Sequence, residues 1–384
     1  MVEWKKLGDI CEIIRGNGVQ KTDFVESGVG CIHYGQIYTH YGSFTYTTNK
    51  YVSKEVFDKA RKASKGDIIM TDTSENVEDI CKSVAYLGEE DIAVSNHALI
   101  LKHKQNPKFL TYSTLTNSFS NQKRKFVFGA KVSGIKPENL AQIKIYLPSL
   151  SEQNRIVGIL DTFTASINNL KEQIAQRRKQ YEYYRDQLLD LEGKEGVEMK
   201  TIKEVCKKIC SGGTPSTSNK DYYGGNIPWL RTQEVDWKEI WDTDIKITEE
   251  AIANSSAKLI PKDCVIVAMY GATAAKVAVN KIPLSTNQAC CNLEIDNNIS
   301  SYRYVYYWLC KEYQNLKGMG EGSQNNINGQ KIKDYSIPLP SLQEQQRIVS
   351  ILDTFEASIQ NLEAQLKQRE KQYDYYRNKL LTFE

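Results

Sequence analysis

The chain has 384 residues, of which 25% are charged and 40% are hydrophobic, and its formal net charge at pH 7 is +3. This composition is typical of a soluble globular protein, and the length is enough for two or three domains with separate cores. No apolar run approaches the roughly 18 residues of a membrane span, and residues 1–10, MVEWKKLGDI, lack a signal-peptide pattern. We therefore expect a cytoplasmic protein that has no membrane partner.

The nine cysteines and four histidines show no spacing typical of a disulfide framework or a metal site. The cysteines form no CxxC pair, which predicts reduced thiols that are mostly buried as small apolar side chains. None of the histidines is spaced with cysteine, aspartate or glutamate as a zinc site requires. The sequence therefore predicts no metal.

Residues 1–147 are predicted to form a first globular domain. Short apolar runs separated by Gly, Asn and Asp turns, such as GDIIMTDT at 66–73, predict a mixed α/β domain with a curved sheet. The segment CIHYGQIYTHYGS at 31–43 carries polar and aromatic side chains that suit base contacts. The run NQKRKF at 121–126 carries basic groups that suit phosphates, with an ordinary solvated loop as the alternative.

Residues 148–192 predict one long helix, because apolar residues recur with the 4-3 spacing of a coiled-coil seam. Pro148 stands where proline is tolerated, just before the helix, and Ser151 is the expected N-cap. Arg177 is the one break in the spacing, and it either fixes the register of the seam or extends out of the seam into solvent. The predicted seam residues of this helix are Ile156, Leu160, Phe163, Ile167, Leu170 and Ile174.

A linker at 193–198, GKEGVE, leads to a second domain at 199–339 and a second long helix at 340–384. Residues 339–384 repeat residues 147–192 at an offset of 192 without a gap, and 31 of the 46 positions are identical. The second domain is a more distant copy of the first, in which TNQA at 286–289 corresponds to SNHA at 95–98. The chain is therefore two units of 192 residues. The seam residues of the second helix are Ile348, Leu352, Phe355, Ile359, Leu362 and Leu366, with Arg369 at the break.

The connectivity predicts how the two helices pair. The first helix carries the chain about 60 Å from its domain, and the short linker leaves little slack before the second domain. If the two apolar seams pack on each other, the second helix must run antiparallel to the first. The predicted fold class is α+β: two mixed α/β domains separated by a two-helix antiparallel coiled coil, a dumbbell with a pseudo-two-fold internal repeat.

No catalytic set is evident in the sequence. There is neither a GxGxxG after a strand nor a GxxxxGK[ST] phosphate loop. Asn106-Pro107 is followed by Lys-Phe, whereas an amino-methyltransferase would carry an Asn-Pro-Pro-Tyr or Asp-Pro-Pro-Tyr tetrapeptide. The sequence therefore favours a protein that is not itself an enzyme.

Polar loops that occur in both domains are the candidate nucleic-acid contacts. Glycines in SGGTPSTSNKDYYGG permit close backbone approach, and Arg231, Gln233 and Glu234 carry groups that read base edges. The alternative for each single position is an ordinary turn residue. The candidates are His33, Tyr34, Gln36, Tyr38, His40, Lys123, Arg124, Lys125, Lys131, Thr214, Ser216, Tyr222, Arg231, Gln233, Glu234, Tyr270, Gln324 and Asn325.

The chain resembles the specificity (S) subunit family of type I restriction–modification systems. The resemblance is carried by the paired LPSL–EQ–RIV–ILD segments at 147–161 and 339–353 and by GGTPSTS…YYGGNIPWL at 212–230. The order domain, helix, domain, helix extends it to the whole chain. The first domain departs from the pattern, because it has Arg15-Gly16-Asn17-Gly18 where the second has Gly-Gly-Thr-Pro.

The resemblance implies a sequence-specific DNA-binding subunit. Each α/β domain would be a target recognition domain that reads one half of a bipartite site in double-stranded DNA, and the long helices would set the distance between the halves. The implied partners are two methyltransferase (M) subunits, which methylate adenine, and restriction (R) subunits, which cleave DNA. S-adenosylmethionine, ATP and Mg²⁺ would belong to those partners, with no cofactor in this chain.

Two other functions fit the same sequence features. A coiled-coil adaptor that joins two protein partners would bind no specific DNA and would show no salt-dependent affinity. A specificity subunit could also serve a methyltransferase that has no restriction partner. A self-contained nuclease or methyltransferase would instead show activity alone.

Overall fold

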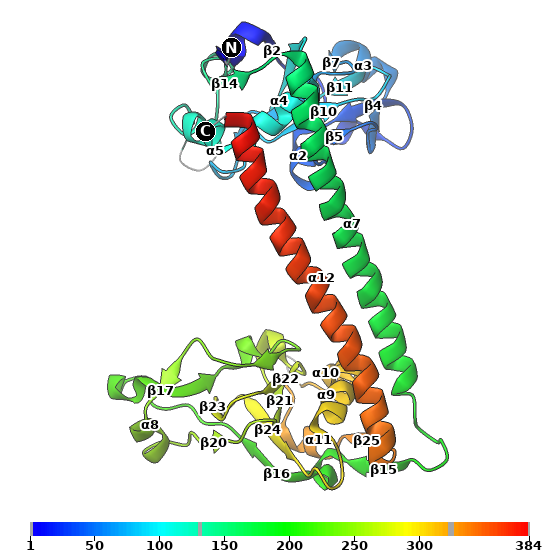
Figure 1. Ribbon diagram of the computed structural model, residues 1–384, viewed down its shortest axis with the longest axis vertical. Helices are drawn as coiled ribbons and strands as arrows, with labels where there is room; N and C mark the ends of the chain where they lie inside the picture. The colour runs from blue at the N-terminus through cyan, green and yellow to red at the C-terminus, as the bar shows by residue number, and fades with distance from the viewer. Residues whose placement is uncertain (1–2, 130–132, 322–325, 383–384) are drawn as a thin grey trace. The chain divides into compact units, whose positions relative to one another are not determined.

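The computed structural model describes residues 3–129, 133–321 and 326–382. The chain divides into two compact units: unit 1 is Met1–Lys171 with Ala364–Glu384, and unit 2 is Glu172–Glu363. Each unit contains one α/β head, the first part of the long helix that follows this head, and the last part of the other long helix (Figure 1). We call the α/β parts head 1 (3–149) and head 2 (198–341).

The two long helices are α7 (Leu150–Leu188) and α12 (Leu342–Thr382), and each lies inside its predicted segment. Their N-caps are Ser149 and Ser341, so the predicted cap at Ser151 is wrong. The backbone N–H groups of Glu152 and Glu344 donate to the hydroxyls of these serines at 3.4 and 3.3 Å. A Ser-x-x-Glu pattern, typical of a helix start, is present in both copies.

Within unit 1, the first part of α7 runs antiparallel to the last part of α12. Phe163 stacks on Tyr376 with ring centroids 5.5 Å apart, and the Arg369 guanidinium lies 5.7 Å from the Phe163 centroid. Lys171 pairs with Glu370 at 3.4 Å. Residue numbers fall along α12 as they rise along α7, which confirms the predicted antiparallel pairing.

Unit 2 contains the same contacts with the two helices exchanged. Phe355 stacks on Tyr184 at 5.4 Å, and the Arg177 guanidinium lies 5.8 Å from the Phe355 centroid. Arg178 pairs with Glu363 at 2.5 Å. The break in the apolar spacing is therefore filled by an arginine over an aromatic ring, which favours the register role for Arg177.

The predicted seam residues have two environments. Ile156 and Leu160 are fully buried in the core of unit 1, and Ile348 and Leu352 are fully buried in the core of unit 2. The residues farther along each helix are nearly or half buried, because a helix pair covers each seam from one side only. They are Phe163, Ile167, Leu170, Ile174, Phe355, Ile359, Leu362 and Leu366.

Head 1 contains two five-stranded sheets, and in each of them one neighbouring pair of strands is parallel. In spatial order the first sheet is β2 (Cys11–Arg15), β12 (Ala98–His103), β8 (Ile68–Thr71), β10 (Ser83–Tyr86) and β5 (Phe44–Thr45). The second is β3 (Phe24–Val25), β6 (Lys50–Val52), β4 (Val29–Ile32), β11 (Ile92–Val94) and β7 (Arg61–Ala63). The helices are α1 (Leu7–Ile10), α2 (Tyr34–Thr39), α3 (Lys54–Lys59), α4 (Pro107–Ser113), α5 (Asn117–Lys123) and α6 (Pro137–Leu140).

Head 2 repeats this architecture. Its five-stranded sheet is β16 (Cys206–Ser211), β24 (Cys290–Ile295), β21 (Val265–Ala268), β22 (Val277–Asn280) and β18 (Glu239–Ile240). Its four-stranded sheet is β19 (Lys246–Ile247), β17 (Tyr223–Leu230), β23 (Leu284–Thr286) and β20 (Leu259–Ile260). The helices are α8 (Glu249–Ala253), α9 (Tyr302–Lys311), α10 (Tyr313–Gly318) and α11 (Gly329–Lys333). The first sheets match strand for strand and the second sheet of head 2 has one strand fewer than that of head 1, which confirms two mixed α/β domains related by duplication.

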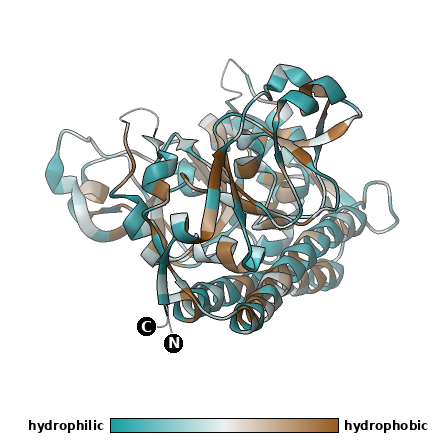
Figure 2. Ribbon diagram, turned by 90° about the horizontal axis from the view of Figure 1, so that it is seen from above, coloured by the Kyte–Doolittle hydropathy of each residue, from teal (hydrophilic) through white to brown (hydrophobic). Residues whose placement is uncertain are grey.

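A two-stranded ladder joins the beginning and the end of each head. In head 1 it pairs β1 (Glu3–Lys6) with β14 (Lys144–Leu147), and in head 2 it pairs β15 (Glu198–Thr201) with β25 (Ser336–Leu339). Each ladder therefore leads the chain from a head directly into a long helix. Along these helices hydrophobic and hydrophilic residues are mixed, whereas many strands of both heads carry hydrophobic residues (Figure 2).

The hydrogen bonds of the two heads correct the expected correspondence by one residue. The backbone N–H of Gly16 donates to Ala98 O at 2.9 Å, and that of Gly212 donates to Cys290 O at 3.2 Å. Ala98 therefore corresponds to Cys290 and not to Ala289. A Cβ on either glycine would lie 2.3 Å or less from a backbone oxygen of the neighbouring loop, so both heads need glycine at this crossing.

A buried glutamine attaches each head to the start of its long helix. Gln153 Oε1 accepts from the backbone N–H of Asn106, and Gln345 Oε1 accepts from that of Ser301, both at 3.0 Å. Asn106 and Ser301 precede α4 and α9. Each long helix therefore holds the first turn of a head helix through the same side-chain amide.

The ends of the long helices complete the two cores. Leu381, near the end of α12, is buried in the core of unit 1. Leu189 and Leu191, which follow α7, are buried in the core of unit 2. Each core is therefore closed by the start of one long helix and by the end of the other.

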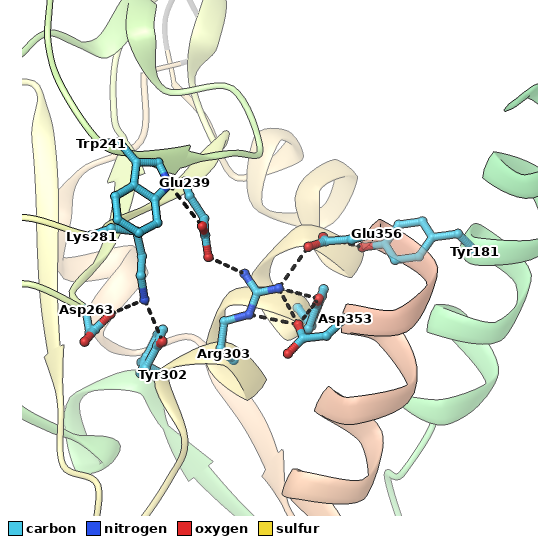
Figure 3. A network of polar contacts seen from close by, with 10 residues as sticks. Tyr181, Glu239, Trp241, Asp263, Lys281, Tyr302, Arg303, Asp353 and Glu356 are labelled. Carbon is cyan, nitrogen blue, oxygen red and sulfur yellow. Dashed lines mark hydrogen bonds and ion pairs between the residues drawn. The ribbon is translucent and has the colours of Figure 1, made fainter. Parts of the chain in front are cut away.

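An arginine cluster further ties α9 to α12 in unit 2 (Figure 3). Arg303 pairs with Asp353, with Glu356 at 2.9 Å and with Glu239 at 3.8 Å. Tyr181 of α7 donates to Glu356 at 3.4 Å. Burial raises the pKa of Glu356, and the Arg303 charge acts against this increase. Three carboxylates therefore share one largely buried guanidinium, whose side chain is 13% exposed.

Unit 1 has a simpler contact at the corresponding place. Lys108 of α4 pairs with Asp161 of α7 at 2.7 Å, and Tyr112 donates to the same carboxylate at 2.7 Å. The Lys108 ammonium also lies 3.8 Å from the ring centroid of Phe44. One ion pair and one aromatic ring thus replace the three-carboxylate cluster.

All nine cysteines are free, and seven of them are buried, as the sequence predicts. No helix in the described part of the chain is both long enough and apolar enough to cross a membrane. Within the same residues, no group of three His, Cys, Asp or Glu side chains has the proximity of a metal site.

Candidate nucleic-acid interface

An open cleft of about 680 Å³ in head 1 gathers four of the five predicted residues of the 31–43 loop. His33, Tyr34, Gln36 and Tyr38 line the cleft. The other lining residues are Lys21, Phe24, Gly35, Thr39, Thr73, Ser74, Glu75, Asn76 and Asp79. The fifth predicted residue, His40, is exposed at the end of α2, outside this lining.

Most polar atoms of the predicted cleft residues are used within the head. Gln36 Oε1 accepts from the backbone N–H of His33 at 2.8 Å, and His33 Nδ1 accepts from that of Gly35 at 3.1 Å. The Tyr38 hydroxyl donates to Thr73 O at 2.7 Å. Burial, together with the nearby charges of Lys21 and His97, lowers the pKa of His33 and favours the neutral ring. These residues therefore give the cleft its shape.

The predicted basic run of head 1 is divided between a structural and an exposed part. Lys123 is buried, and its ammonium donates to the carbonyl oxygens of Glu78 and Ile80, each at 2.7 Å. Burial lowers its pKa. Arg124 and Lys125 are exposed, and Arg124 pairs with Glu78 at 3.3 Å. The fourth predicted residue, Lys131, lies outside the described residues.

The glycine-rich loop of head 2 places its predicted residues at different depths. Ser216 is exposed and shares a hydrogen bond of 2.8 Å with Ser218, whereas Thr214 is half buried. Tyr222 packs on the small core around Trp229. Ser216 is therefore the member of this group whose hydroxyl is most accessible.

Arg231, Gln233 and Glu234 of head 2 are bound to one another. Glu234 accepts from the backbone N–H of Arg231 at 3.2 Å and from that of Asp244 at 3.1 Å. With the Gln233 amide turned so that its oxygen faces Arg231, this oxygen accepts from both terminal guanidinium nitrogens at 3.0 and 3.1 Å. Like His33 of head 1, Arg231 immediately precedes a short helix and is followed three residues later by its capping side chain.

Tyr270, the predicted residue that follows β21 in head 2, is exposed. Its side chain is 41% exposed, and it precedes a short helical turn, Gly271–Thr273. The backbone N–H of Gly271 donates to the side-chain oxygen Oδ1 of Asn326 at 3.3 Å. The predicted residues Gln324 and Asn325 lie outside the described residues.

Head 1 also contains one charged cluster that the sequence does not predict. Asp72 is buried and lies 3.0 Å from Arg15 and 3.8 Å from His97. These residues come from β2, from the end of β8 and from the loop between β11 and β12. Arg15 belongs to the divergent loop at residues 15–18, but its separation from Asp72 in the sequence gives no signal of their contact.

Sequence comparison identifies the family. The family described as "Type I restriction modification DNA specificity domain" matches residues 1–177 and again residues 194–370. A putative type I restriction enzyme specificity subunit of Haemophilus influenzae is 31% identical over 313 residues, which is 75% of this chain and 76% of that protein.

Two further relatives match more locally. The specificity subunit of an Escherichia coli type I restriction enzyme is 36% identical over 264 residues, 64% of each chain. That of a Methanocaldococcus jannaschii enzyme is 32% identical over 193 residues, 49% of this chain and 44% of the relative. The alignments thus span less than two thirds of these two relatives.

Solved structures show the same fold. The S subunit of a type I restriction–modification system from M. genitalium superposes with a TM-score of 0.60 at 15% identity, covering 99% of this chain and 96% of that one. A chain from a structural study of the assembly of a type I system gives a TM-score of 0.65 at 17% identity, with 99% and 97% covered. This chain therefore belongs to the family of type I restriction–modification DNA specificity domains and carries two copies of the domain.

Proposed function

We propose that this chain is the specificity subunit of a type I restriction–modification complex. Head 1 and head 2 each read one half of a bipartite site in double-stranded DNA. The observation that carries the proposal is the contrast within one duplicated chain: the contacts between helix and head recur in both units, while the exposed polar groups of the heads differ. Such a chain suits two unlike half-sites read by one scaffold.

The proposed partners follow from the family. Two methyltransferase subunits bind to this chain and methylate one adenine in each half-site after turning the base out of the duplex. Restriction subunits complete the nuclease. S-adenosylmethionine, ATP and Mg²⁺ are held by these partners, and this chain contributes sequence choice without catalysing a step.

The exposed basic side chains support a DNA-facing surface on head 1. Arg15, Arg124 and Lys125 are exposed there, and lysine and arginine supply the phosphate contacts of most DNA-binding proteins. An adaptor between two proteins has no need of a specific DNA site. It therefore differs from a specificity subunit in a measurable way.

The test is to map N6-methyladenine in a host that expresses the neighbouring methyltransferase gene with and without this chain. The expected result is methylation that appears only with both proteins, in a motif of two short halves separated by a fixed gap. Methylation that is unaffected by this chain, or no motif although the two proteins co-purify, would refute the proposal and favour the adaptor.

A further inference from the structure

A buried carboxylate in head 1 holds two exposed basic side chains. The side chain of Asp72 is 3% exposed, whereas those of Arg15 and His97 are 58% and 57% exposed. Asp72 Oδ2 lies 3.0 Å from Arg15 Nη2, and Asp72 Oδ1 lies 3.8 Å from His97 Nδ1. Within the described part of the chain, Asp72 is the one ion-pair partner of Arg15. More than half of the Arg15 side chain therefore remains accessible.

Stability alone gives little reason for this arrangement. Burying a carboxylate costs free energy that an exposed arginine recovers only in part, and burial raises the pKa of Asp72 despite the two neighbouring cations. Asp72 Oδ1 accepts no hydrogen bond from the described residues. Unfavourable groups of this kind are commonly kept where they position a functional side chain.

The surrounding backbone is firmly held. The backbone N–H of Asp72 donates to His97 O at 3.2 Å, and that of Gly18 donates to Asn96 Oδ1 at 3.1 Å. His97 has a positive φ of 62°, which is uncommon for a residue other than glycine and is found mostly where the surroundings enforce it. The backbone around the cluster of Arg15, Asp72 and His97 is therefore held in place before any ligand binds.

The cluster lies beside the cleft of head 1. The ring of His97 contacts that of Tyr34 edge-on, with centroids 5.4 Å apart, and Tyr34 lines the cleft. Thr73, the residue after Asp72, also lines the cleft. Arg15 and His97 thus extend the predicted contact surface of the 31–43 loop.

Head 2 shows that the fold does not require these charges. The strand registers place Ser211, Met269 and Ala289 at the positions of Arg15, Asp72 and His97. The corresponding backbone bond is kept, since the N–H of Met269 donates to Ala289 O at 2.8 Å. The cluster is therefore a property of head 1 alone.

We propose that Arg15 is a base-reading residue of head 1, that its ligand is the major-groove edge of a guanine, and that Asp72 is its positioning residue. An arginine presents two parallel donors that match the O6 and N7 acceptors of guanine. A carboxylate behind the guanidinium fixes its orientation and leaves the remaining N–H groups free for the base. This inference rests on the proposed function of the chain.

The test uses the full chain with its methyltransferase partner and compares methylated motifs. Arg15→Gln replaces the guanine-reading fork by an amide that suits adenine. We expect discrimination against adenine at one guanine position of one half-site to fall by about tenfold or more, while the other half-site and the gap stay unchanged. Asp72→Asn should relax the same position to a smaller extent, because the guanidinium is retained but is held less firmly.

Two control variants separate base reading from general effects. Arg124→Gln removes an exposed arginine of the same head, and Ser211→Gln alters the corresponding position of head 2; neither should relax the position that Arg15→Gln relaxes. If Asp72→Asn does not fold, Arg15→Gln decides alone, since Arg15 is exposed. An unchanged motif for folded Arg15→Gln would overturn the inference and leave the proposed function standing. The absence of any motif with the unaltered chain would overturn both.

Discussion

Head 1 and head 2 share the strand order of their first five-stranded sheet but carry different charges at corresponding positions. The cluster of Arg15, Asp72 and His97 in head 1 is replaced by Ser211, Met269 and Ala289 in head 2, although the backbone bond between the strands is kept. Conversely, head 2 has Arg231 where head 1 has His33, before a short capped helix. A duplicated scaffold can thus carry an arginine at different positions in its two copies, which is what the proposed reading of two unlike half-sites requires.

The contacts between head and helix show the opposite behaviour. The buried glutamine, the serine cap and the arginine over a phenylalanine occur at the same place in both units. The glutamines are buried, the arginines pack on aromatic rings and the exposed serines cap helix ends, so that a change in one copy would disturb a core, a seam or a helix end. The comparison separates the parts that position the heads from the parts that distinguish them.

Shortening both long helices, which belong to the repeated part of the molecule, should have the largest effect of all changes on the DNA site that is methylated. Deleting residues 171–177 and 363–369 removes one heptad at corresponding places and preserves the seam. Each helix loses about 10 Å, which corresponds to about three base pairs of duplex. We expect the original site to lose methylation and any new motif to have a shorter gap with the same halves. Altered half-sites with an unchanged gap, seen by methylation mapping, would contradict the role of the helices as spacers.

Matched core truncations should cost similar free energy in the two units. Leu160→Ala and Leu352→Ala each remove a fully buried side chain from the start of a long helix, with an expected loss of about 2–5 kcal/mol in the free energy of unfolding. Urea unfolding measures this loss. The exposed residues two positions later provide the controls, Thr162→Ala and Thr354→Ala, which should change stability little. A loss confined to one unit would show that the helices are anchored differently.

Removing the cation of the ion pairs between head and helix should destabilise the two units by different amounts. Arg303→Met leaves Asp353 and Glu356 without their cation and should cost about 2–3 kcal/mol near neutral pH, whereas Lys108→Met removes one pair and should cost less. Since burial raises the folded-state pKa of Glu356 above its ordinary value of 4.5, its ionisation disfavours the folded state as pH rises through that raised pKa. Loss of Arg303 enlarges this penalty.

The destabilisation by Arg303→Met should therefore be greatest at neutral pH and should decrease as pH falls and the carboxylates become protonated. Thermal unfolding of the variant and the unaltered chain between pH 4.5 and 8 measures this difference. A cost that is independent of pH would mean that packing of the arginine stem, and not its charge, holds α9 to α12.

The smallest loss of stability is expected from substitutions in the seam between the long helices. Phe163→Leu and Phe355→Leu remove the ring that a tyrosine stacks on and an arginine covers, and each should cost about 0.5–1.5 kcal/mol. Equal values, measured by chemical unfolding, would agree with the repeated geometry. The exposed Tyr183 and Tyr375 meet the stacking tyrosines edge-on and serve as controls, since Tyr183→Leu and Tyr375→Leu should cost less than the phenylalanine changes.

The repeated part of the fold could be predicted from the sequence because its signals are local. A seven-residue period defines a seam whatever surrounds it, and the short linker makes an antiparallel return the simplest arrangement. The Ser-x-x-Glu pattern at Ser149 and Ser341 is equally local, and the predicted cap at Ser151 does not take it into account. The predicted alignment of residues 95–98 with 286–289 is wrong by one residue, because these two segments look alike when their sheet register is not known.

The candidate site depends on contacts that the sequence does not encode locally. Asp72 meets Arg15 and His97 only because β12 lies between β2 and β8 in the sheet, and this order could not be derived from the strand sequences. Similarly, Lys123 and Arg124 are neighbours in one basic run, but packing of α5 buries the first and exposes the second. Residue type predicted which loops carry polar groups, and tertiary packing decided which of these groups are free.

The central claim is that each head reads its own half-site, and replacing one head by the other tests it most directly. In the proposed variant, residues 198–341 replace residues 1–149, so that both long helices follow a copy of head 2. Methylation mapping with the partner methyltransferase should then give a motif whose two halves are the same sequence in inverted orientation. Persistence of the half-site assigned to head 1, in a variant that folds and binds its partner, would contradict the account.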